Sequence, residues 1–127
     1  MKPISKTIEE LYDRREATGE VILDEMANCL RRTRIIAVSD LAALMDVDAH
    51  QLNMAVHLLT GMTTRDIINR WRLLQACELL GQGAMGEAKD GSRDDRIRVL
   101  NAVARRCGWR SYRVLLKVAH RYGVRVE

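Results

Sequence analysis

The chain is 127 residues long and 47% hydrophobic, which is enough for one domain or two very small ones with a core, and no apolar run is long enough to cross a bilayer. Phe is absent and aromatic residues make up 4%, which weighs against binding of single-stranded nucleic acid by base stacking on aromatic rings. The net charge of +4 is uneven: residues 93–127 carry ten basic and three acidic side chains, a net +7, and residues 1–92 carry a net −3. We therefore expect a protein of the cytoplasm, associated with the nucleoid, whose C-terminal part seeks a polyanion.

Residues 1–20 are expected to form an N-terminal extension helix, because Ile4, Ile8 and Leu11 recur at helical spacing and Gly19 can end the helix. Spacings of three and four between apolar residues continue along the chain, and strand-like alternation is absent. The sequence thus predicts an all-α fold. The extension helix is a candidate surface for another regulator or for a second copy of the chain.

A first helix-turn-helix unit is expected over residues 21–62. Ser39 is the predicted N-cap of a short helix, and Asp48 is the predicted N-cap of the helix that follows the turn. Gly61 is suited to end that second helix.

The second helix of this unit has an apolar and a polar face. Its predicted inward residues include Leu52, Val56 and Leu59, and its predicted outward residues are His50, Asn53, Met54 and His57. Asn pairs with adenine, and Met contacts the thymine methyl group, but the face carries no Lys or Arg, so its attraction for phosphate is weak. A face that is merely solvated, or that binds protein, explains these residues equally well.

Residues 63–80 are expected to form a connecting helix. It begins at Thr63 and Asp66, which resemble a capping box with Asp in place of the usual Glu. Ile67 and Trp71 mark one apolar flank, and Leu73 and Ala76 mark another, so both flanks should be buried. A Gly-rich flexible linker is expected over residues 81–92.

A second helix-turn-helix unit is expected over residues 93–127, with Gly108 in the turn and Ser111 as the N-cap of the last helix. Leu115 and Ala119 are predicted to face inward. The predicted outward positions are Tyr112, Arg113, Leu116, Lys117 and His120.

Arg113 and Lys117 lie one helical turn apart, and both side chains can bind the O6 and N7 acceptors of guanine in the major groove. A merely solvated basic surface is the alternative for an isolated charged helix, but the local charge excess favours DNA. Phosphate contacts are expected from the flanking residues Arg105, Arg106, Arg110 and Arg121. We expect no catalytic activity, no metal and no cofactor, because neither an activated nucleophile nor ligand spacing is present.

From Val21 to Val124 the chain resembles the DNA-binding domain of AraC/XylS-type bacterial transcription regulators. The resemblance rests on Leu41-Ala42, Leu52, Thr60-Gly61-Met62, Arg72-Leu73, Ala76 and, most specifically, the segment Val103-Ala104-Arg105-Arg106-Cys107-Gly108-Trp109. It implies two helix-turn-helix units on a connecting helix, inserted into successive major grooves of double-stranded DNA, without an effector domain. Contacts with DNA are expected from His50, Asn53, Met54, Arg110, Ser111, Tyr112, Arg113, Leu116, Lys117, His120 and Arg121.

The chain departs from the family pattern mainly in the first unit, where Met54 stands in place of the usual Arg and His57-Leu58 in place of a basic pair. The sequence therefore predicts a transcriptional regulator that binds DNA mainly through its last helix. The competing prediction is a protein-interaction module derived from such a regulator.

Overall fold

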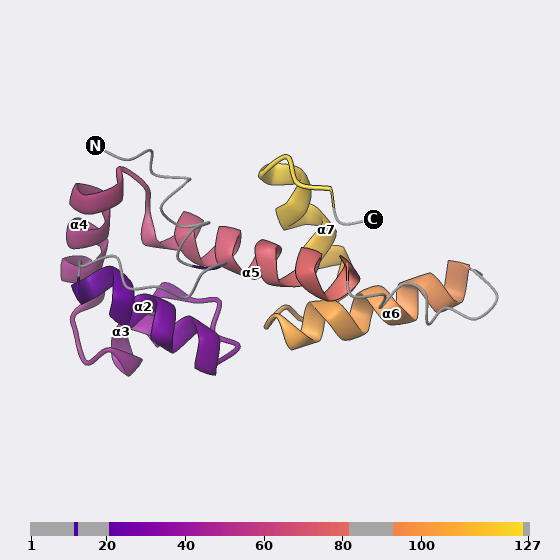
Figure 1. Ribbon diagram of the computed structural model, residues 1–127, viewed down its shortest axis with the longest axis horizontal. Helices are drawn as coiled ribbons and strands as arrows, with labels where there is room; N and C mark the ends of the chain where they lie inside the picture. Colours follow the sequence, from indigo (N-terminus) through magenta and orange to yellow (C-terminus); the bar gives the residue numbers. More distant parts are fainter. Residues whose placement is uncertain (1–11, 13–20, 82–92, 126–127) are drawn as a thin grey trace. The chain divides into compact units, whose positions relative to one another are not determined.

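The computed structural model describes Tyr12 and residues 21–81 and 93–125, and every regular element within them is helical (Figure 1). The all-α prediction is therefore confirmed. The helices are α2 (Val21–Arg32), α3 (Val38–Leu44), α4 (Ala49–Thr60), α5 (Thr64–Gly81), α6 (Arg93–Arg106) and α7 (Tyr112–Arg121). Apart from Tyr12, the expected extension helix lies outside the described residues, as does the expected linker apart from Gly81. None of the described helices is long and apolar enough to span a membrane.

The chain divides into two compact units, Met1–Trp71 and Arg72–Glu127. The boundary lies inside α5, so this helix contributes its first half to one unit and its second half to the other. The sequence predicts residues 63–80 as a helix that connects two units. Residues of both predicted apolar flanks of this helix are buried. Ile67 and Trp71 are buried in the first unit, and Leu73 and Ala76 are buried in the second.

The core of the first unit is built from α2, α3, α4 and the start of α5. Its centre is Trp71, which is 2% exposed, and Tyr12 meets the Trp71 ring edge-on, with ring centroids 5.0 Å apart and planes at 82°. Arg31 lies over the same ring, with its guanidinium carbon 5.3 Å from the centroid. Aromatic and cation–π pairs of this kind each contribute about 1 kcal/mol beyond burial. Other members of this core are Met26, Leu30, Leu41, Leu52, Val56 and Ile68.

Helix α3 begins one residue before the position expected for its cap. Ala37, in an extended conformation, takes the N-cap place without a side-chain hydrogen bond, and the prediction that Ser39 caps the helix is wrong. Val38 packs against the core, which draws the first helical residue to position 38 and leaves Ser39 exposed within the first turn.

The turn between α3 and α4 is a Schellman motif, in which Asp46 adopts φ +58° and the amide of Val47 donates to the carbonyl of Ala42 over 3.0 Å. Asp48 then caps α4 as predicted, its Oδ2 accepting from the amide of Gln51 at 3.2 Å. Gly61 ends α4 in the left-handed conformation, also as predicted, with φ +73°.

The second unit includes α6, α7 and the last half of α5. Gly108 occupies a second Schellman motif at φ +96°, and the amide of Trp109 donates to the carbonyl of Ala104 over 2.9 Å. Its position confirms the predicted glycine turn. Trp109 itself is 3% exposed and joins Leu100 and Leu115 among the buried residues of this unit.

Candidate nucleic-acid interface

The N-terminus of α7 is fixed by a side chain of α6. Ser111 occupies the N-cap position in an extended conformation, as predicted, but its hydroxyl makes no capping hydrogen bond. The amide of Tyr112 instead donates to Oδ1 of Asn101 over 2.8 Å. Asn101 lies eleven residues earlier in the chain, beyond the reach of local spacing rules for caps. This bond ties the beginning of α7 to the neighbouring helix.

Helix α7 has one buried and one charged side. Leu115, Val118 and Ala119 are buried, at 0%, 9% and 2% exposure. At 100° per residue, the exposed residues of the helix fall within an arc of about 100° on the opposite side. We call these four exposed residues, Arg113, Lys117, His120 and Arg121, the α7 basic face.

Arg113 and Lys117 stand one turn apart at the centre of the α7 basic face, which is the placement that the sequence predicted for them. Tyr112 and Leu116 were predicted to point outward, but each is only half-exposed. Both residues lie at the border between the buried side and the basic face, so they form its rim. Ser111 is half-buried next to them.

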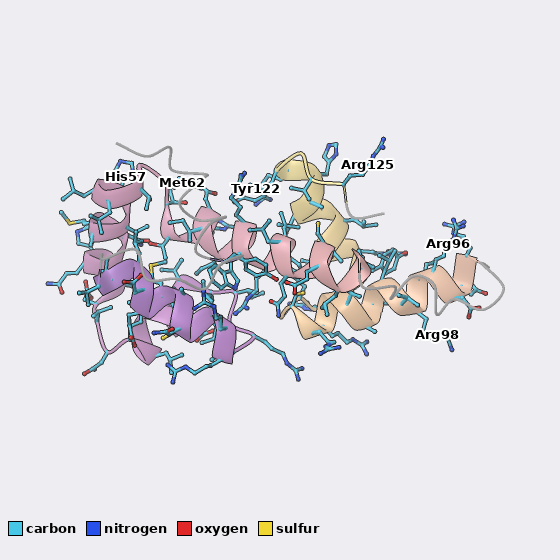
Figure 2. All side chains as sticks on the ribbon, in the orientation of Figure 1. His57, Met62, Arg96, Arg98, Tyr122 and Arg125 are labelled. Carbon is cyan, nitrogen blue, oxygen red and sulfur yellow. The ribbon has the colours of Figure 1, made fainter. Side chains whose placement is uncertain are left out.

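Three further cations surround the α7 basic face in sequence: Arg105 and Arg106 in the last turn of α6, and Arg110 in the turn before α7. All three are exposed. In the described part of the chain, no carboxylate forms an ion pair with them or with the α7 basic face. An ion pair on α6 joins Arg98 Nη2 to Asp95 Oδ1 at 2.9 Å. Figure 2 shows Arg96 and Arg98 leaving α6 on opposite sides. The cations around α7 are thus available to an external anion.

The predicted outward face of α4 is exposed: His50, Asn53, Met54 and His57 all reach the surface. Leu59 was predicted to point inward, and this prediction is wrong, since 39% of it is exposed. Leu52, Val56 and Thr60 already cover the inner side of the helix and leave Leu59 at its edge.

The charge of the α3–α4 pair differs sharply from that of the α6–α7 pair. Residues 38–60 contain three acidic side chains, Asp40, Asp46 and Asp48, and no Lys or Arg, a net −3. Residues 93–121 contain nine basic and two acidic side chains, a net +7. A polyanion is therefore attracted to the second pair and repelled by the first.

The cysteines are free thiols, with Cys29 and Cys107 buried and Cys77 half-buried. Desolvation raises the pKa of the Cys107 thiol to about 11, so this group stays protonated at neutral pH. Within the described ranges, no group of three or more His, Cys, Asp or Glu side chains is arranged to hold a metal ion.

Comparison with protein families, with curated proteins and with solved structures finds no match to this chain.

Proposed function

We propose that this protein is a transcriptional regulator of the AraC/XylS type, which binds double-stranded DNA by placing α7 in the major groove. One observation carries the proposal: Arg113 and Lys117 project together from the exposed side of a well-anchored helix, and no carboxylate of the described residues neutralises them. An α-helix fits the major groove of B-DNA, and Arg and Lys are the side chains that bind guanine there. Such a protein works in the cytoplasm, at the nucleoid.

The two helix pairs end their first helices in the same way, which supports a helix-turn-helix role for both. Helices α3 and α6 each stop in a Schellman motif, at Asp46 and Gly108, and four residues separate α3 from α4 while five separate α6 from α7. In helix-turn-helix proteins the second helix of such a pair is the one that lies in the groove. The charges of residues 38–60 and 93–121 make α7 the stronger DNA-binding helix of the two.

Binding of a labelled random-sequence duplex, followed by fluorescence anisotropy at several salt concentrations, tests the proposal. Each phosphate contact adds about −0.9 to the slope of log K against log salt, so about five contacts weaken binding several hundred-fold between 50 and 200 mM. Selection from a pool of random duplexes should then recover a preferred site. An affinity that does not change with salt overturns the proposal.

A second function, protein association through α4, is favoured by the exposure of apolar residues on this helix. Leu58 is 87% exposed and Met54 is 61% exposed, in a segment without Lys or Arg. Exposed apolar residues that cluster on one helix mark interaction surfaces. This function predicts a complex by size-exclusion chromatography with light scattering, disrupted by Leu58→Glu, together with DNA affinity that shows no sequence preference.

A further inference from the structure

A groove of about 550 Å³ runs beside α4 in the first unit. Four of its lining residues come from the outer face of α4, and the others come from the beginning of α3 and from the start of α5. The lining residues are Val38, His50, Asn53, Met54, His57, Thr63 and Arg65. The sequence predicts these α4 residues either as DNA contacts or as a solvated or protein-binding face, and the structure adds lining residues from α3 and α5 beside them.

The wall at the α4–α5 turn is held by hydrogen bonds. The Thr60 hydroxyl donates to the carbonyl of Val56 at 2.7 Å and accepts from the amide of Met62 at 3.1 Å. Thr63 Oγ1 accepts from the amide of Asp66 at 3.1 Å. Figure 2 shows His57 near the end of α4 and Met62 in the turn that follows. The backbone at this end of the groove is therefore held by hydrogen bonds within the turn.

The lining of the groove combines apolar surface with a single formal charge. Met54 and Val38 provide aliphatic surface, and the rings of His50 and His57 provide flat faces. Among the described residues, Arg65 is the only Lys or Arg that lines the groove, no carboxylate lines it, and Arg65 forms no ion pair. A volume of about 550 Å³ lies within the range of small-molecule sites, which are apolar with a few polar groups.

From this arrangement we infer that the groove binds a small organic monocarboxylate with an aromatic or branched aliphatic body. The Arg65 guanidinium pairs with the carboxylate, and the body of the ligand lies against Met54 and Val38. DNA is a poor occupant, since residues 38–60 carry a net −3 that repels a run of phosphates. A small ligand with a single carboxylate can pair with Arg65, and it lacks the further negative charges that these acidic residues would repel in DNA. This inference does not depend on DNA binding by α7.

The three histidines of the chain provide a direct test by NMR. His50 and His57 line the groove, and His120 lies on α7 in the other unit, where it serves as an internal reference. The probe is 2-naphthoate, compared with its uncharged amide, 2-naphthamide, and with the cation 2-naphthylmethylamine. We expect 2-naphthoate to shift the imidazole signals of His50 and His57 in a saturable way and to leave His120 unchanged. The amide should bind about tenfold more weakly, the loss expected for one charge-assisted hydrogen bond, and the amine more weakly still.

Two variants separate the groove from general charge effects. Arg65→Gln should weaken 2-naphthoate about tenfold and leave 2-naphthamide unchanged. Arg34→Gln is the matched control, because Arg34 is an exposed cation of the same unit outside the groove, and it should bind 2-naphthoate like the unmodified protein. Equal binding of the three probes, or shifts that appear at His120 as strongly as at His50 and His57, overturns the inference. So does a shift of His50 and His57 by duplex DNA or by protein concentration alone, which would assign the groove to those occupants.

Discussion

Replacing both central cations of the α7 basic face, in the variant Arg113→Ala with Lys117→Ala, is the sharpest test of the proposed DNA contacts. Both side chains are exposed on α7, and neither packs in the core of the second unit. Ala has the highest helix propensity, so α7 should keep its structure. The variant thus removes two positive charges and leaves the fold of the helix in place.

The expected effect follows from counterion release. If both residues contact phosphate, the slope of log K against log salt falls in magnitude by about 1.8, from about −4.5 for five contacts to about −2.7 for three. Between 50 and 200 mM salt, the affinity of the variant should then fall about 40-fold, compared with about 500-fold for the unmodified protein. If instead one of them binds guanine in the groove, discrimination at that base pair should fall by about 1 to 3 kcal/mol.

The matched control is Arg93→Ala with Arg96→Ala, which removes the same charge from the same unit. Both residues are exposed in the first turn of α6, away from the α7 basic face in sequence. Fluorescence anisotropy with one duplex over a salt series measures all three proteins, and circular dichroism verifies their helix content. Equal slopes for the two double variants would refute the argument, because binding would then depend on net charge and not on α7.

Three further predictions concern stability, measured by urea denaturation. Asn101→Ala should cost about 1 kcal/mol, since it removes the cap of α7, whereas Ser111→Ala should change little; the reverse order would contradict the cap assignment. Leu52→Ala, at a position with 0% exposure, should cost about 2 to 5 kcal/mol, and Leu58→Ala, at 87% exposure, less than about 0.5 kcal/mol. The folded state raises the pKa of the Cys107 thiol from 9.0 to about 11, so the thiol contributes of the order of 1 to 2 kcal/mol to the free energy of unfolding below about pH 9, and this contribution is lost as pH rises through 11. Cys107→Ala should remove this part of the pH dependence of stability, and a plot of stability against pH that the substitution leaves unchanged would disprove it.

Helix boundaries that depend on a single residue could be predicted from the local sequence. Asp48 and Gly61 act where they were predicted to act, because a carboxylate cap and a left-handed glycine each satisfy backbone groups within a few residues. Gly108 is a third example of this kind. Such positions can be found without knowledge of the tertiary fold.

Predictions failed where tertiary contacts overrode a local rule. The spacing around Ser111 is that of an N-cap, but its hydroxyl makes no capping hydrogen bond, and Asn101 from α6 accepts a hydrogen bond from the first amide of α7. The helical period places Leu59 inward, yet it lies at the edge of the inner side of α4 and 39% of it is exposed. The sequence does not predict Arg65 as a site residue, because its position beside the outer face of α4 depends on the turn between α4 and α5.

In the two helix pairs, the residues that end the first helix and the residues that set the surface charge are different. Asp46 and Gly108 stop α3 and α6 with the same pattern of hydrogen bonds, although one residue carries a side chain and the other does not. The two helix pairs have net charges of opposite sign, a net −3 over residues 38–60 and a net +7 over residues 93–121. Since affinity for a polyanion depends on the surface and not on the stop signal, a shared backbone motif is compatible with different ligands. The charge of each pair, rather than its fold, is therefore what supports our proposals of DNA as the ligand of α7 and of a smaller anion as the ligand of the α4 groove.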